Sequence, residues 1–198
     1  MTGRTMTPVL REALLPEGRT SGLVRDGALV VAGVLALWAA AKIAVPMWPV
    51  PITMTTFAVL TIGAAYGPGL GLATVLAYLA VGAAGVPLFA GDTAGLAYVL
   101  GGTGGYLVGY ALAAGVLGSA ARRGLDRTVG GTVLALLAGT VAIYIPGLLW
   151  LGQMPYAEGV AWTIEKGALP FLIGDALKVA LAALVLPTAW RLVGRARG

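Results

Sequence analysis

Long stretches without any charged residue constrain this chain more than any other feature of its sequence. Residues 43–91, 93–121 and 128–157 contain no Asp, Glu, Lys or Arg. An apolar segment of about 18 residues or more is long enough to cross a bilayer as a helix. Segments of about ten residues with alternating polarity, which a transmembrane β-barrel requires, do not occur. The sequence therefore predicts an all-α, multi-pass membrane protein surrounded by the lipid bilayer.

Glycine and proline residues divide the apolar sequence into six predicted spans. These spans are 27–45, 53–66, 70–84, 106–121, 129–151 and 168–192. Segments 85–105 and 152–167 are predicted to be loops, because they are too polar or too rich in glycine to cross a membrane. The predicted architecture is a six-transmembrane-helix bundle at residues 25–198, preceded by a cytoplasmic tail or surface helix at residues 1–24.

The distribution of charge predicts the orientation of the bundle. An even number of spans places both termini on one side, together with ten of the thirteen basic residues: Arg4, Arg11, Arg19, Arg25, Arg122, Arg123, Arg127, Arg191, Arg195 and Arg197. The opposite loops carry Asp92, Glu158, Glu165 and Lys166. The positive-inside rule then predicts that both termini are cytoplasmic. The net charge of +5 reports this topology, so we expect no nucleic-acid partner.

Several classes of enzyme are excluded by missing residues. The chain has no cysteine and no histidine, which excludes disulfides and Ser-His hydrolases and argues against zinc. No lysine follows a glycine, so the Gly-Lys-Ser/Thr sequence of a phosphate-binding loop is absent. We therefore expect neither an enzyme nor a metal or cofactor site in this chain.

Asp175 and Lys178 are the candidate functional residues inside a predicted span. Charged side chains at membrane depth usually face the bundle interior or a water-filled cavity, because exposing them to lipid costs about 2.5–3.5 kcal/mol each. Their spacing of three residues places both on one helical face. The pair either forms the polar floor of a ligand site open to the outside or serves only as an internal ion pair in a membrane scaffold. In the ligand-binding interpretation, Asp175 accepts N–H groups and Lys178 meets a carboxylate or carbonyl.

The loop between the third and fourth spans has the composition of a lid. It combines flat aromatic side chains with hydrogen-bonding groups, a mixture found in ligand pockets. The candidate residues are Phe89, Asp92, Tyr98, Thr103 and Tyr106. The alternatives are an interfacial aromatic belt for the tyrosines and a solvated turn for Asp92.

A stripe of alanines in the first span includes Ala32, Ala36 and Ala40. Small residues at intervals of four let helices approach closely in lipid. The stripe serves either internal packing or the docking of a second membrane subunit.

Five motifs in order resemble the BioY family of biotin-specific substrate-binding (S) components of energy-coupling-factor (ECF) vitamin transporters. They are PVPIT at 49–53, GPGLG at 67–71, GAAGVPLFAG at 82–91, GGTGGYLVGY at 101–110 and LPFLIGDALK at 169–178. The resemblance covers nearly the whole chain beyond residue 25. Gly102 stands where members often have Pro, and Gly91 or Asp92 stands where many carry Asn.

The resemblance implies high-affinity biotin uptake across a bacterial inner membrane. It implies that Asp175 and Lys178 help to hold biotin, with the loop that includes Gly91 and Asp92 closing over it. It implies as partners a coupling transmembrane protein, docked on the alanine stripe, and two ABC-type ATPases. The sequence leaves open whether the chain forms homo-oligomers.

Overall fold

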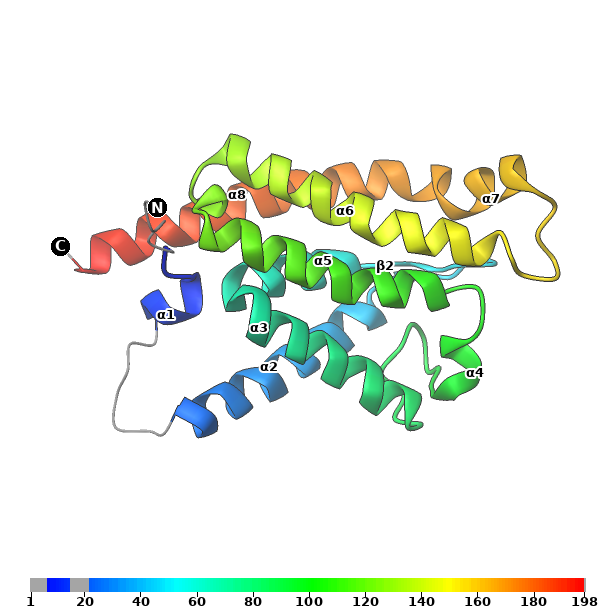
Figure 1. Cartoon of the computed structure of the whole chain (residues 1–198), viewed down its shortest axis with the longest axis horizontal. Helices are drawn as coiled ribbons and strands as arrows, with labels where there is room; N and C mark the ends of the chain where they lie inside the picture. The colour runs from blue at the N-terminus through cyan, green and yellow to red at the C-terminus, as the bar shows by residue number, and fades with distance from the viewer. Residues whose placement is uncertain (1–6, 15–21, 198) are drawn as a thin grey trace, which may run out of the picture.

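The protein is a bundle of long helices in which the first described helix and the C-terminal part of the last helix lie at the same end (Figure 1). The structure, a computed structural model, describes residues 7–197 except 15–21. Its helices are α1 (Leu10–Leu14), α2 (Gly22–Lys42), α3 (Thr55–Ala83), α4 (Gly95–Val99), α5 (Gly104–Arg122), η1 (Leu125–Arg127), α6 (Val129–Leu151), α7 (Val160–Gly167), η2 (Leu169–Phe171) and α8 (Leu172–Arg197). Strands β1 (Ala44–Val45) and β2 (Ile52–Thr53) form a short antiparallel hairpin.

Among the described residues, five helical segments are long and apolar enough to cross a membrane: Gly22–Lys42, Thr55–Ala83, Gly104–Arg122, Val129–Leu151 and Val160–Gly194. This confirms the prediction of a helical, multi-pass membrane protein. The helices replace water as the partner of every backbone amide, which is what the bilayer interior requires.

The second of these segments, α3, reverses direction at Gly67. Gly67 has φ of 83° and ψ of 175°, which are not helical values, and Pro68 follows it. A Cβ built on Gly71 would lie 3.0 Å from the Cα of Gly63, although eight residues along a straight helix span about 12 Å. The two arms of α3 therefore fold back on each other, and they correspond to the separate spans predicted at 53–66 and 70–84.

Close approach between helices depends on glycine. Helix α5 packs between α3 and α6. A Cβ on Gly109 would lie 2.6 Å from the Cα of Ile143 in α6, and one on Gly63 would lie 2.9 Å from the Cα of Ala114 in α5. Without a hydrophobic driving force in lipid, such small-residue contacts let the backbones pack closely enough for dispersion forces to hold the bundle.

The end of the bundle that holds α1 and the C-terminal part of α8 also holds the bend of α3 and η1 (Figure 1). A Cβ on Gly67 would lie 3.3 Å from Val9, and Val9 is fully buried. The carboxylate of Glu12 pairs with both terminal nitrogens of Arg122 at 2.7 and 2.5 Å. Residues 7–14 of the predicted 1–24 tail thus pack against the bundle, whereas residues 22–24 form the exposed start of α2. The domain boundary at residue 25 stays a prediction.

Helix α2 lies at the side of the bundle and packs mainly against α3. It buries Gly33, Leu37 and Ala41. Ala32 and Ala36 face outward, whereas Ala40 is half-buried. The alanine stripe is therefore not used for packing within the chain along most of its length.

The structure corrects three local expectations at the other end of the bundle. The predicted 85–105 loop contains helix α4. Part of the predicted 152–167 loop forms helix α7. The predicted sixth span at 168–192 begins instead as the short η2 helix with Pro170 in its first turn, and α8 proper starts at Leu172. Helix α7 buries Thr163 and Gly167, while Val160 and Ile164 stay exposed.

Candidate ligand-binding site

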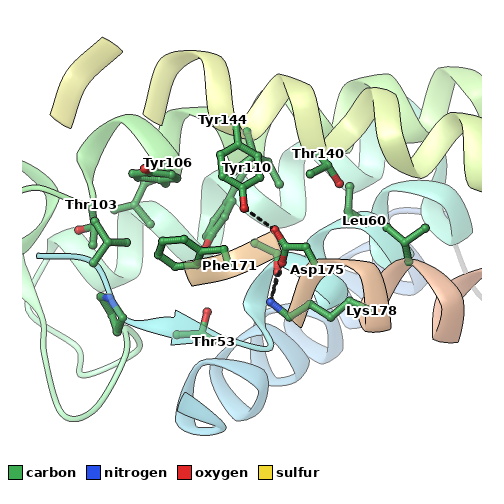
Figure 2. A pocket seen from close by; sticks show the side chains of 16 residues that line it. Thr53, Leu60, Thr103, Tyr106, Tyr110, Thr140, Tyr144, Phe171, Asp175 and Lys178 are labelled. Atoms are coloured by element: carbon green, nitrogen blue, oxygen red, sulfur yellow. Dashed lines mark hydrogen bonds and ion pairs between the residues drawn. The ribbon is translucent and has the colours of Figure 1, made fainter. Parts of the chain in front are cut away.

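A cavity that is partly open to the surface of the protein lies between the hairpin, the first arm of α3, and helices α5, α6 and α8. Figure 2 shows the side chains that surround it. Its lining consists of Val50, Pro51, Thr53, Thr56, Leu60, Thr103, Tyr106, Leu107, Tyr110, Thr140, Ile143, Tyr144, Phe171, Asp175, Lys178 and Val179.

The polar centre of the cavity is the pair predicted from the sequence. Lys178 Nζ lies 2.9 Å from Asp175 Oδ1 and donates to Thr56 Oγ1 at 2.9 Å. Tyr144 donates its hydroxyl proton to Asp175 Oδ2 at 2.7 Å. The side chains of Lys178 and Asp175 are 9% and 14% exposed. Both ions are thus nearly desolvated, and hydrogen bonds from two other helices fix their orientation (Figure 2).

The start of α8 explains why a carboxylate is stable here. Asp175 lies in the first turn of α8, because the helix starts at Leu172 and not at residue 168. A helix N-terminus carries partial positive charge from its unpaired N–H groups, which favours a carboxylate. Lys178 follows less than one turn later and balances the remaining charge.

Lys178 retains hydrogen-bonding capacity toward the cavity. An ammonium group has three N–H donors, and within the described residues two of them are used on Asp175 and Thr56. A buried charge with a spare donor beside an open space is well suited to an anionic or carbonyl oxygen from a ligand.

The walls around this polar centre are mostly apolar and aromatic. Tyr106 and Phe171 lie with ring centroids 6.4 Å apart, and Tyr106 and Tyr144 are also 6.4 Å apart. The hydroxyl of Tyr106 donates to the carbonyl of Gly167 at 2.7 Å, which ties α5 to the end of α7. Threonine hydroxyls at 53, 103 and 140 add isolated hydrogen-bonding groups.

An aromatic cluster joins two of the connections at the same end. The ring of Trp48 lies 5.1 Å from that of Tyr156 and 5.9 Å from that of Trp162. Trp48 precedes Val50 and Pro51, which line the cavity. The cluster therefore links the cavity-lining hairpin to the α6–α7 connection.

The structure brings together some of the candidate residues and separates others. Tyr106 and Thr103 line the cavity with Asp175 and Lys178. Phe89 and Tyr98 stack on each other outside this lining, with ring centroids 4.9 Å apart. The loop residues Gly91 and Asp92 instead surround the ammonium of Lys42.

Sequence reasoning missed the partners of the central pair. Tyr144, Tyr110 and Thr56 all line the cavity. Tyr144 is the only residue of α6 with an aromatic hydroxyl, and a phenol in the middle of an apolar span requires a partner when buried. That signal could have singled it out, whereas nothing local distinguishes Thr56 from its neighbour Thr55.

The model of the BioY family matches residues 9–195 of the sequence. The chain belongs to the BioY family. This confirms the resemblance inferred from the five motifs. The match includes α1 and continues almost to the end of α8, so the whole described bundle is part of the BioY fold.

Individual BioY relatives support the assignment. The chain is 37% identical to a probable biotin transporter BioY of Pyrococcus horikoshii over 73% of this chain and 83% of that protein. It is 31% identical to the biotin transporter BioY of Thermotoga maritima over 82% of this chain and 92% of that protein. It also resembles, at 22% identity, the crystal structure of the S-component for biotin from an ECF-type ABC transporter, with a TM-score of 0.75 over 88% of this chain and 95% of the other. The last likeness establishes the shared fold.

Proposed function

We propose that this protein binds biotin with high affinity and takes it up across the membrane as the S component of an ECF-type transporter. The observation that carries the proposal is the position of Asp175 and Lys178, whose buried charges face a partly open cavity in a BioY bundle. The named functions of the relatives support the same ligand.

The chemistry of biotin suits the cavity. Its valerate carboxylate or ureido carbonyl would accept the spare N–H of Lys178, and its ureido N–H groups would donate to Asp175 or to threonine hydroxyls. Its apolar thiophane ring would contact the rings of Tyr106 and Phe171. These contacts combine a few placed polar groups with an apolar wall, as small-molecule sites usually do.

The proposed topology has six spans with both termini in the cytoplasm. In this proposal the two arms of α3, which reverse at Gly67, count as separate crossings, so that the five long segments give six spans. The end that holds the bend, α1 and η1 carries Arg122, Arg123 and Arg127, which the positive-inside rule places in the cytoplasm. The cavity then faces the outside of a bacterial cytoplasmic membrane.

The proposed partners are a coupling transmembrane protein and two ABC-type ATPases, which would supply the energy for uptake. Ala32 and Ala36 on α2 present a small-residue surface to the outside of the bundle. This surface supports the docking of a membrane helix at close range. Whether the chain also associates with itself stays open.

Equilibrium binding of tritiated biotin to the purified protein tests the proposal directly. We expect saturable binding, one biotin per chain, with Kd below about 1 µM. Biotin methyl ester, which lacks the carboxylate charge, and a biotin analogue with a methylated ureido nitrogen serve as competitors to locate each end of the ligand. Absence of saturable binding at micromolar biotin would contradict the proposal and favour a scaffold whose ion pair is structural.

A further inference from the structure

Lys42, the last residue of α2, lies inside a ring of oxygen atoms from the α3–α4 connection. Its Nζ donates to the carbonyl of Pro87 at 2.9 Å, to the carbonyl of Phe89 at 3.3 Å and to the carbonyl of Gly91. Oδ1 of Asp92 lies 3.5 Å away. Three carbonyls match the three N–H donors of an ammonium group. Lys42 thus fastens one helix end to one loop.

The backbone carbonyls, and not the nearby carboxylate, account for most of this contact. The side chain of Asp92 is fully exposed, with a relative exposure of 101%, whereas that of Lys42 is 27% exposed. An ion pair with a solvated partner contributes little. Hydrogen bonds from a charged donor to carbonyls are stronger than neutral ones, and here they join residues about 45 positions apart in the sequence.

The fastened loop continues to the wall of the cavity through a row of contacts. Phe89 is 1% exposed, and its ring is stacked on that of Tyr98 at 4.9 Å with an interplanar angle of 14°. The carbonyl of Tyr98 accepts a hydrogen bond from Thr103 Oγ1 at 3.2 Å. Thr103 lines the cavity. Stacked rings and hydrogen bonds from side chains to backbone carbonyls therefore connect Lys42 to the cavity lining.

The other end of this row is the helix with the outward-facing alanines. Lys42 terminates α2, and Ala32 and Ala36 lie on its exposed side. Because α2 packs mainly against α3, a shift of α2 can occur without disrupting the contacts of α5, α6 and α8. Lys42 would carry such a shift directly to the loop.

We propose that Lys42 is a positioning residue that couples α2 to the binding cavity, through loop 85–93 and the Phe89–Tyr98–Thr103 contacts. A partner membrane protein that moves α2 thereby loosens the cavity wall, and an undisturbed α2 keeps that wall in place. The part of this inference that concerns ligand rests on the proposed biotin binding. The part that concerns the contact between Lys42 and the loop is independent of biotin binding.

Hydrogen exchange of the ligand-free protein in detergent or nanodiscs tests the fastening itself. In the Lys42→Met variant we expect the amides of residues 86–100 to exchange about tenfold faster, the change expected for loss of hydrogen bonds to a charged group. The matched control is Lys166→Met, which removes an exposed lysine that pairs with its neighbour Glu165. Unchanged exchange in the Lys42→Met variant would overturn the proposal.

Biotin kinetics test the transmission to the cavity. We expect Lys42→Met to speed both association and dissociation of tritiated biotin by about tenfold, with a smaller change in Kd. A variant that was merely destabilised would lose binding sites but would not associate faster. If Lys42→Met exchanged its loop amides faster but bound and released biotin at the wild-type rates, the proposed coupling to the cavity would be overturned. Failure of the wild-type protein to bind biotin would instead refute the proposed function and leave the exchange experiment to judge the fastening.

Two further variants separate the contributions of the donors and the carboxylate. Asp92→Asn should leave both the amide hydrogen exchange and the biotin association and dissociation rates within about twofold of wild type, because the ion pair of Asp92 is solvated. Lys42→Arg keeps the charge and several donors and should preserve more protection than Lys42→Met, although its planar group cannot converge on three carbonyls as an ammonium does. If residues 86–100 exchanged as fast in Asp92→Asn as in Lys42→Met, the carboxylate would be the group that holds the loop. That result would overturn the assignment to the carbonyls.

Discussion

Two ion pairs in this protein have the same chemistry and different surroundings. Asp175 and Lys178 meet at 2.9 Å with side chains 14% and 9% exposed, beside a cavity. Glu12 and Arg122 meet at 2.5 Å with side chains 30% and 25% exposed, where the N-terminal segment packs on the end of the bundle. The first pair is more buried and yet adjoins more free space.

The two pairs differ in their hydrogen-bond partners and in the space beside them, and this difference predicts different roles. Both nitrogens of the Arg122 fork engage Glu12, and the carbonyl of Arg122 accepts from the backbone N–H of Thr7 at 3.1 Å. Both oxygens of the Glu12 carboxylate are thus engaged by the protein, and neither member of this pair lines the cavity. The Lys178 ammonium has donor capacity left and a cavity in which to use it. The comparison predicts that the Asp175–Lys178 pair contributes to biotin affinity and that the Glu12–Arg122 pair contributes to folding stability.

The largest expected effect comes from Lys178→Met. We expect biotin affinity to fall by about 100-fold, because hydrogen bonds to a charged group contribute up to about 3 kcal/mol. The bundle should remain folded, since Asp175 keeps the Tyr144 hydrogen bond and its place at the N-terminus of α8. Isothermal titration with biotin measures the affinity, and the melting temperature reports the fold.

Arg122→Met is the matched control for that variant. It removes a cation of the other pair, and we expect Kd within about twofold of wild type because Arg122 lies outside the cavity lining. If instead Lys178→Met failed to fold, at the penalty of about 3–5 kcal/mol expected for breaking a sealed buried pair, the distinction between the two pairs would be lost and the scaffold interpretation would gain support.

A smaller effect is expected from Tyr144→Phe. The variant removes the hydroxyl that orients Asp175 and leaves the ring in place, so biotin affinity should fall by about tenfold with little change in melting temperature. Tyr156→Phe is the control, since Tyr156 is 38% exposed and lies outside the cavity lining. Equal effects of the two variants on Kd would argue against a role for the Tyr144–Asp175 bond.

The smallest effect is expected from Glu12→Gln, and it concerns stability. Loss of a partly exposed pair should lower the free energy of unfolding by about 1 kcal/mol with Kd unchanged. Burial alone raises the pKa of Glu12, but the hydrogen bonds from Arg122 and the amide of Val9 outweigh it, so the folded-state pKa lies below its ordinary value.

A depressed folded-state pKa fixes the sign of the pH dependence. The stabilisation by Glu12 is fully present above its ordinary unfolded pKa and is lost as pH falls through the lower folded-state pKa. The wild-type melting temperature should therefore approach that of Glu12→Gln as the solution is acidified. A constant difference between the two proteins across that range would contradict the assigned pairing.

Hydropathy and motif order predicted much of the fold and the centre of the site. The apolar segments correspond to membrane-length helices, and the motif at 169–178 located the pair that lines the cavity. The lid residues were harder to predict. Asp92 has the chemistry of a ligand-binding acid, but the path of its loop brings it to Lys42, a contact that no local pattern indicates. The roles of the candidate residues in binding stay predictions.

By itself, the sequence determined that this chain crosses a membrane as helices, belongs with the BioY proteins, and keeps an acid and a base on one face of its last helix. These properties follow from composition and short-range spacing, which the chain carries before it folds. The tertiary structure alone decided that Tyr144 and Thr56 hold the pair and that Lys42 holds the loop. Those outcomes depend on which distant segments meet, and that is set by the packing of whole helices.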